Sequence, residues 1–280
     1  AIRMGLEGAS ADSNISVSAH VANIGWQNTS TAPGYSGTVG QSKAIQAVKI
    51  ALNGKIAEDY DVYYSVYVAG YGWLGWAKNG DPAGTEGLSL QAEAIKVALV
   101  KHGKSAPSSS TPAYLNSPTL ELKASVSGSG WQGAVHNGGI AGTTGKGRSI
   151  QALTIKVSSP VSGGISYAAH VSNVGWQAAV FDGAVAGSVD QGHKIECVKL
   201  SLTGDMSKYY NVWYRVHISN YGWMGWTKNG SQAGSTGVGY GVEAIQVKVL
   251  PKSAAAPGST NKPYTNERYH PSRVVLNVPC

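Results

Sequence analysis

The feature that most constrains this chain is a short motif that occurs five times. The run YGWLGWAKNG at residues 71–80 returns as YGWMGWTKNG at residues 221–230, and a Gly-Trp step also occurs at residues 25–26, 130–131 and 175–176. A Gly-rich segment follows each Gly-Trp, and an alternating apolar run closes each unit, at residues 44–50, 94–97, 150–155, 195–200 and 244–249. Self-similarity of this kind indicates repeated copies of one supersecondary unit.

The composition favours short strands and tight turns over helices or disorder. Charged residues make up only 13% of the chain, whereas Gly occurs 37 times and Tyr 15 times. Tyr and Trp combine an apolar body with a polar group, so they suit half-exposed surfaces better than Phe, which occurs once. Residues 15–21 alternate apolar with polar side chains, as a half-buried strand does. We therefore predict an all-β fold.

The positions of the repeats predict two domains. The predicted first domain, residues 1–99, contains a closing strand at 1–8 and units at 14–52 and 60–99, so its leading unit is incomplete. A linker rich in Pro and Ser follows at residues 100–118. The predicted second domain, residues 119–250, contains units at 120–157, 165–202 and 209–249. Residues 251–280 form a linker-like tail that ends in a strand.

Three units between two linkers favour a domain that closes on itself. We predict two tandem pseudo-threefold domains, each a β-trefoil or β-prism-like arrangement of short β-repeat units, joined by the Pro/Ser-rich linker. Such closure leaves few unpaired strand edges. An open solenoid is the competing architecture.

The tail repeats the linker and then begins another unit. Residues 252–266 resemble residues 104–116, and the run Arg273, Val274, Val275, Leu276, Asn277 and Val278 corresponds to the first strand of the third unit. We predict that this run adds as a strand to the incomplete first domain of another protomer, which generates rings or filaments. The alternative is that the chain is a segment of a longer array whose flanking residues complete both ends.

The order of these elements resembles a known family. An aromatic strand, Gly-Trp, Ala-Gly-Thr-x-Gly and then Glu-Ala-Ile-x-Val, as at residues 83–87 and 93–97, is similar to the clostridial hydrophobic W (ChW) repeat. The resemblance covers about residues 14–99 and 120–249. It implies a secreted or surface protein of Gram-positive bacteria, with a role in adhesion or polysaccharide binding and with no catalytic residues.

The tryptophans separate into two predicted groups. We align Trp26, Trp76, Trp131, Trp176 and Trp226 as the tryptophan of every unit, and a residue present in every copy is expected to pack inside the unit, with sugar stacking as the alternative. Trp73 and Trp223 then occur only in units two and five. We predict that they are exposed beside a tyrosine, a lysine and an asparagine and bind a glycan or a partner surface. The predicted binding residues are Tyr71, Trp73, Lys78, Asn79, Tyr221, Trp223, Lys228 and Asn229.

The sequence offers no support for catalysis, cofactors or metal binding. No Ser/His/Asp set or carboxylate pair can be assembled from its spacing, and His20 and His170 are expected to be structural. The net charge of +7 is scattered, which argues against nucleic-acid binding. No apolar run approaches the roughly 18 residues of a membrane span. Cys197 lies in a strand pattern and is expected to be a buried free thiol; with Cys280 it is too little for a disulfide scaffold.

Together these observations predict a non-catalytic, extracellular β-repeat protein. The leading hypothesis is an adhesion or structural assembly module at the bacterial surface that associates with itself. The alternative is a lectin-like module that binds cell-wall or environmental polysaccharide through the predicted aromatic residues.

Overall fold

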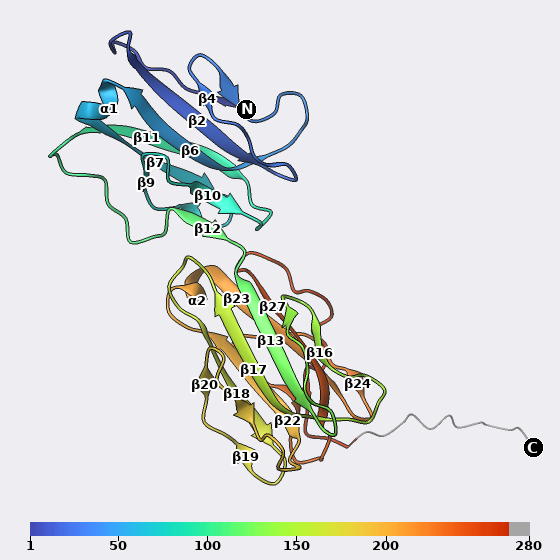
Figure 1. The fold of residues 1–280 in the computed structure, drawn as a ribbon. Coiled ribbons are helices and arrows are strands. Elements are labelled where there is room, and N and C mark those ends of the chain that lie inside the picture. The colour runs from blue at the N-terminus through green and yellow to red at the C-terminus, as the bar shows by residue number, and fades with distance from the viewer. Residues whose placement is uncertain (269–280) are drawn as a thin grey trace, which may run out of the picture. The chain divides into compact units, whose positions relative to one another are not determined.

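The computed structural model describes residues 1–268 and is almost entirely β (Figure 1). The helices in that part of the chain are two single turns, α1 (Ile56–Asp59) and α2 (Met206–Tyr209). The chain divides into two compact domains, the first from Ala1 to Ser117 and the second from Pro118 onward. The predicted all-β repeat fold is confirmed, whereas residues 273–278 and Cys280 lie outside the described residues.

Each repeat is built on one long antiparallel hairpin. The opening strands of repeats 1 to 5 are β2 (Ser13–Val21), β7 (Tyr60–Val68), β13 (Thr119–Val126), β18 (Ile165–Val171) and β23 (Tyr210–Ile218). The closing strands are β6 (Ile45–Gly54), β11 (Ala92–Lys101), β17 (Ile150–Ser158), β22 (Ile195–Leu202) and β27 (Val242–Pro251). Because side chains alternate along a strand, one face of each hairpin is apolar, and outside β11 it forms the core, as Val212, Tyr214 and Val216 do in β23.

Two short strands pair with the edge of each opening strand that faces away from the closing strand. The first of them are the Gly-Trp strands, β3 (Gly25–Trp26), β8 (Gly72–Trp73), β14 (Gly130–Trp131), β19 (Gly175–Trp176) and β24 (Gly222–Trp223). The second are β4 (Ser30–Thr31), β9 (Ala77–Lys78), β15 (Val135–His136), β20 (Val180–Phe181) and β25 (Thr227–Lys228). Both pair antiparallel with the opening strand of their own repeat.

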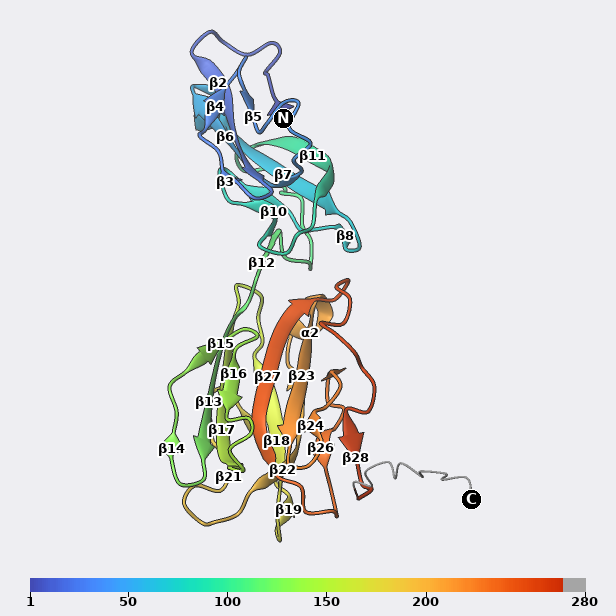
Figure 2. The same cartoon turned by 90° about the vertical axis from the view of Figure 1, so that its right-hand side faces the viewer.

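A third short strand in each repeat joins it to a neighbouring repeat. These strands are β5 (Tyr35–Ser36), β10 (Ala83–Glu86), β16 (Ile140–Gly142), β21 (Ala186–Gly187) and β26 (Ala233–Ser235). In the second domain β17 pairs with β21, β22 pairs with β26, and β27 pairs with β16, which Figure 2 shows beside it. Repeats 3, 4 and 5 therefore close on one another in a ring, which an open solenoid does not do.

A glycine permits each of these junctions in the ring. Gly142, Gly187 and Gly234 have φ angles of +98°, +100° and +120°, and a Cβ on any of them would lie 2.3 Å from a carbonyl oxygen of the adjoining closing strand. Only glycine combines this backbone conformation with such a close approach.

A buried tyrosine joins repeats a second time. The Tyr167 hydroxyl accepts a hydrogen bond from the Ile155 amide of the preceding repeat, at 3.0 Å, and donates to the Ala184 carbonyl. Tyr64 and Tyr214 occupy the equivalent positions and donate to the carbonyls of Asp81 and Ser231. Burial raises the pKa of Tyr64 to about 12. These hydroxyls therefore act as hydrogen-bonding groups rather than acids.

The first domain contains one full junction and part of a second. β6 of repeat 1 pairs with β10 of repeat 2. The segment at residues 1–8 supplies β1 (Ile2–Arg3), which pairs with β5 and so occupies the place of a closing strand. The outer edge of β11, by contrast, has no strand partner among the described residues of its sheet.

The expected linker is partly a strand of the first domain, so its predicted extent is wrong. β12 (Tyr114–Asn116) pairs in parallel with β10, and β28 (Tyr264–Thr265) pairs with β26 in the same way. Just before β12, a Cβ on Gly75 would lie 2.0 Å from the Thr111 carbonyl oxygen, so the absence of a side chain at Gly75 admits this segment. A Pro/Ser-rich composition predicts extended backbone, but it does not reveal that the backbone has partners.

Candidate functional site

The structure corrects the alignment of the tryptophans. In the β-pairing, Trp26, Trp73, Trp131, Trp176 and Trp223 each lie opposite the same position of the opening strand, which is His20, Tyr67, Ser125, His170 and His217 respectively. Trp73 and Trp223 are therefore the common tryptophans, and Trp76 and Trp226 are the additional ones. The prediction went wrong because Gly-Trp occurs twice in repeats 2 and 5, and the sequence does not reveal which of the two is paired.

The common tryptophans are half-exposed and most of them lie in a stack. The rings of Trp26, Trp176 and Trp223 make edge contacts with a histidine at 5.4–5.6 Å between centroids, and Trp73 makes the same contact with Tyr67. A cation lies over the ring in each of these four repeats: Lys49 at 4.3 Å, Lys96 at 3.9 Å, Lys199 at 4.2 Å and Arg215 at 4.5 Å from the ring centroid. Cation–π attraction therefore holds these indoles against the hairpin.

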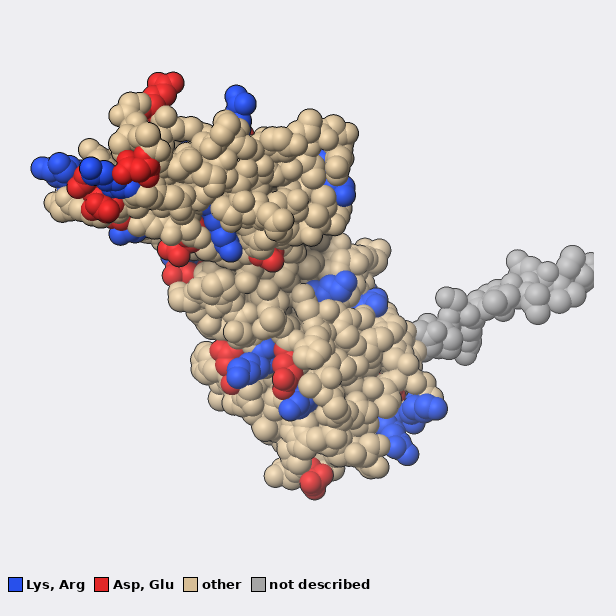
Figure 3. Space-filling view, turned by 45° about the horizontal axis from the view of Figure 1, so that its top comes forward, with Lys and Arg blue, Asp and Glu red and all other residues tan. Residues whose placement is uncertain are grey.

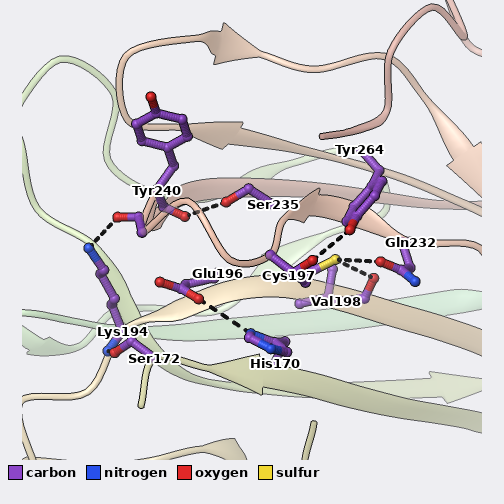
Figure 4. A network of polar contacts seen from close by, with 12 residues as sticks. His170, Ser172, Lys194, Glu196, Cys197, Val198, Gln232, Ser235, Tyr240 and Tyr264 are labelled. Carbon is purple, nitrogen blue, oxygen red and sulfur yellow. Dashed lines mark hydrogen bonds and ion pairs between the residues drawn. The ribbon is translucent and has the colours of Figure 1, made fainter. Parts of the chain in front are cut away.

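In three of these stacks a glutamate also contacts the histidine or the indole. These glutamates were not predicted from the sequence. Glu196 Oε2 lies 3.4 Å from His170 Nδ1 (Figure 4), and Glu243 Oε2 lies 3.0 Å from His217 Nδ1. In repeat 1 the carboxylate comes from repeat 2: Glu86 accepts a hydrogen bond from Trp26 Nε1 at 3.1 Å. The signal in the sequence is a glutamate, Glu196 or Glu243, that directly precedes the cross-strand partner of the histidine and lies at a register shift of the hairpin.

Glu86 is held in its ionised form. The Tyr114 hydroxyl donates a hydrogen bond to it, and this bond, with the one from Trp26, lowers the pKa of the carboxyl. Tyr114 belongs to β12, so a segment within the expected linker also orders the aromatic stack of repeat 1.

The additional tryptophan of repeat 5 is more enclosed than the common one. Trp226 is only 4% exposed, and its backbone amide donates to the Ser259 carbonyl at 2.8 Å. Arg215 lies between the two indoles of repeat 5, at 4.5 Å from Trp223 and 5.0 Å from Trp226. Trp226 therefore fills the space over the hairpin that a smaller residue leaves open in other repeats.

The structure does not bring Lys78 and Asn79 to Trp73. Along β7, Trp73 lies opposite Tyr67 and Lys78 opposite Tyr63, which separates them by about 13 Å at the rise of a strand. Lys78 forms an ion pair with Asp61 at 2.8 Å, and its hydrogen bond is the main cause that lowers the pKa of Asp61. Asn79, at a positive φ of 46°, accepts a hydrogen bond from the Val62 amide. These two residues hold the turn.

The equivalent residues of repeat 5 behave in the same way. Asn229 accepts from the Val212 amide at 3.1 Å, and Lys228 lies 4.9 Å from the Trp213 ring. Tyr221 is engaged as well: its hydroxyl donates to the Glu267 carbonyl, and Lys262 lies 4.9 Å from its ring. Tyr71 is half-buried in its turn.

Two repeats present an open cavity at the common tryptophan. In repeat 1 a cavity of about 400 Å³ is lined by Trp26, Ser18 and Lys49, among others. In repeat 3 a cavity of about 650 Å³ lies at the equivalent place, lined by Trp131 and Thr154. Because the two cavities use the same positions of two repeats, they are a property of the repeated unit.

Metal ligands, membrane-spanning helices, the free thiol and surface charge are the other features of the described chain that bear on function. Residues 1–268 contain no group of three His, Cys, Asp or Glu side chains placed to hold a metal ion, and no helix there is long and apolar enough to cross a membrane. Cys197 is buried, and burial raises the pKa of its thiol to about 12 (Figure 4). Lys and Arg lie scattered among uncharged and acidic residues on the face in Figure 3.

Comparison with known families matches these five repeats. The family model of the clostridial hydrophobic W (ChW) repeat matches five times, at residues 20–54, 67–101, 126–159, 170–204 and 217–251. Comparisons with curated proteins and with solved structures gave no match. Each matched segment starts at or beside the opening-strand residue that faces the common tryptophan and runs to the end of the closing strand. The chain belongs to the clostridial hydrophobic W family.

Proposed function

We propose that this protein is a non-catalytic, extracellular β-repeat protein that serves at the bacterial surface as an adhesion and structural assembly module. Its copies join head to tail when a strand of one copy completes the first domain of the next. The observation that carries this proposal is the exposed core face of β11. For the completed domains we propose a β-prism-like arrangement of three hairpins, which the ring of pairings among repeats 3, 4 and 5 supports.

The closing strand of repeat 2 exposes side chains that other repeats bury. Val97 and Leu99 of β11 are 42% and 44% exposed, whereas Val247 and Val249, at the equivalent positions of β27, are 0% and 2% exposed. Exposed apolar strands next to an unpaired edge favour the addition of another strand.

A cavity marks the place where a further hairpin would lie. It has a volume of about 570 Å³ and is lined by Leu6 from the segment after β1, by Ile56 of α1 and by Leu99 of β11. Closing strands pair with an opening strand of their own repeat elsewhere in the molecule, but β1 pairs only with β5 among the described residues. An opening strand beside β1 would therefore cover this cavity.

The occupant that we propose is the run 273–278 of another copy. Val274, Leu276 and Val278 alternate with other residues, as the buried residues of an opening strand do. This run follows β28 in the chain as β13, an opening strand, follows β12. Since donor and acceptor lie in different domains, the contact is heterologous and yields rings or filaments.

Light scattering and electron microscopy of the 280-residue chain test the proposal. We expect assemblies that dissociate when residues 270–280 are deleted and when Val97→Lys and Leu99→Lys are introduced together. Phe181→Lys, which changes an apolar residue of the second domain that is 59% exposed, is the control and should leave assembly unchanged. A monodisperse monomer, or assemblies that survive the deletion, would refute strand donation.

A second candidate function is binding of polysaccharide by the common tryptophans. It is favoured by the exposure of Trp73, Trp131 and Trp176, at 36%, 40% and 37%, because half-exposed indoles provide flat amphipathic surfaces. Titration of the intrinsic tryptophan fluorescence with soluble oligomers of neutral hexoses tests this function. The absence of any spectral change with every oligomer would contradict it.

A further inference from the structure

Repeat 3 differs from the other four repeats at its tryptophan. Its opening strand places Ser125, rather than an aromatic residue, opposite Trp131. Its closing strand places Thr154 where repeats 1, 2 and 4 have Lys49, Lys96 and Lys199. Within residues 1–268, no aromatic ring or cation stacks on Trp131, and its ring is the most exposed of the five common tryptophans at 40%.

The space in front of this indole is also open. The third residue after Trp131 is Ala134, whereas the third residue after Trp73 and Trp223 is a further tryptophan. The cavity at Trp131 has a volume of about 650 Å³, compared with about 400 Å³ for the one at Trp26, where Lys49 lies over the ring. Repeat 3 therefore keeps a free aromatic face at the edge of a concave surface.

Polar groups of both signs line the same cavity. Glu121 and Lys123 project from β13 and form an ion pair at 3.2 Å with both side chains nearly half exposed. Thr154 and Lys156 project beside them from β17, because Lys123 faces Thr154 and Glu121 faces Lys156 in the register. The wall thus contains a carboxylate, two ammonium groups and a hydroxyl, which together supply hydrogen-bond donors and acceptors within reach of one ligand.

We propose that this cavity is a subsite for a neutral hexopyranose unit of a polysaccharide. The apolar C–H face of the sugar ring lies on the indole of Trp131, and its hydroxyls bond to Glu121, Lys123, Thr154 and Lys156. The proposal rests on the second candidate function above and narrows it to one repeat. The Glu121–Lys123 ion pair neutralises two of the three charges and leaves Lys156 as the one excess charge of the wall. Recognition therefore rests on the indole face and on hydrogen bonds to sugar hydroxyls, both of which a neutral hexose satisfies.

The most direct test introduces into repeat 3 the lysine that covers the indole in other repeats. Thr154→Lys introduces the side chain that repeats 1, 2 and 4 carry at this position and should cover the indole while the fold remains intact. The probes are hexamers of glucose, mannose, galactose and N-acetylglucosamine, with a galacturonate hexamer as the anionic arm, followed by NMR of the tryptophan indole N–H signals.

We expect a neutral hexamer to shift the Trp131 signal, and both Thr154→Lys and Trp131→Ala to weaken its binding by about tenfold or more. Phe181→Ala, which removes an exposed aromatic ring of the same domain that does not line the cavity, is the matched control and should bind as the unaltered chain does. Glycan binding that both Thr154→Lys and Trp131→Ala leave unchanged would overturn the subsite but keep the broader function. A response to the galacturonate hexamer alone would overturn the proposal that the sugar is neutral. No response to any hexamer would overturn both the subsite and the polysaccharide-binding function.

Discussion

Gly142 of repeat 3 lies against Glu243 of repeat 5 so closely that a Cβ on Gly142 would be 2.3 Å from the Glu243 carbonyl oxygen. This contact closes the ring of the second domain, since Gly142 is the last residue of β16 and pairs with Ala244 of β27. The pairing of β16 with β27, two strands that are distant in the sequence, therefore requires that residue 142 have no side chain.

Replacing Gly142 with alanine should destabilise the second domain. The methyl group can be accommodated only if β16 and β27 move apart, and the φ of +98° is unfavourable for alanine as well. We expect a loss of at least about 1–3 kcal/mol in the free energy of unfolding, measured by urea titration. Gly133→Ala is the control, because a Cβ added to Gly133 would meet no atom within 4 Å and its φ is not positive. Equal stability of the two variants would contradict this account.

Replacing Tyr167 with phenylalanine should weaken the junction between repeats 3 and 4. The hydroxyl bonds both the Ile155 amide and the Ala184 carbonyl, and its loss leaves the buried Ile155 amide unpaired. We expect a cost of about 1–3 kcal/mol and faster hydrogen exchange at the Ile155 amide. Tyr35→Phe removes a hydroxyl from a residue that is 58% exposed and should change neither quantity. Unaltered exchange at Ile155 in the Tyr167 variant would count against the hydrogen bond.

Trp226 and Trp131 should differ in their contribution to stability. Trp226→Ala removes an indole that is 4% exposed and should cost about 3–5 kcal/mol. Trp131→Ala removes one that is 40% exposed and free of stacking partners in the described structure, so its cost should be clearly smaller. Thermal and urea unfolding measure both. Comparable losses would show that the common tryptophan of repeat 3 is a packing residue after all.

The ionisation of Glu86 should depend on Tyr114. Because the hydrogen bond from Tyr114 lowers the pKa of the Glu86 carboxyl below its usual 4.5, ionised Glu86 stabilises the fold above that pH, and this stabilisation is lost as the pH falls through the lowered value. Tyr114→Phe should raise the pKa of Glu86 toward its usual range. A carbon-13 NMR titration of the Glu86 carboxyl measures the change, with Tyr35→Phe as the control. A Glu86 pKa that does not move would exclude this coupling.

The thiol of Cys197 should be unreactive in the native protein. Burial raises its pKa to about 12, so the thiolate that reacts with alkylating reagents is scarce at a pH of about 8, and the sulfur is enclosed as well. We expect iodoacetamide to label the Cys197 peptide only after denaturation, as followed by peptide mass spectrometry. Rapid labelling under native conditions would show that the strand β22 opens readily.

The sequence predicted the repeats, the long strands and the place of residues 1–8 as a closing run, because alternation and self-similarity are local properties. It misassigned the common tryptophan of repeats 2 and 5, since both Gly-Trp steps satisfy the same local pattern and only the pairing with Tyr67 and His217 distinguishes them. The partners of these rings were missed for a related reason. Lys96 and Glu243 reach their rings across the hairpin, and cross-strand neighbours follow from the register rather than from the composition.

The predicted binding cluster illustrates the same difficulty. Lys78 is near Trp73 in the sequence, but the chain runs on along β7 between them, and Lys78 forms its ion pair with Asp61 instead. Conversely, repeat 3 is distinguished by Ser125 and Thr154, which stand where other repeats have an aromatic ring and a cation. This difference can be recognised only when the five repeats are aligned through their strand pairing.

The pairing of β16 with β27 also sets a limit on how the second domain is made. Residues 140–142 leave the ribosome early, but their partners at 244–246 belong to the last hairpin of the ring. During synthesis, β16 must wait for that hairpin, and folding has to bring together segments that are far apart in the chain, which slows it. Until then the strand edge at Ile140 remains available to other chains, so the emerging polypeptide passes through a stage at which closure of the ring competes with aggregation.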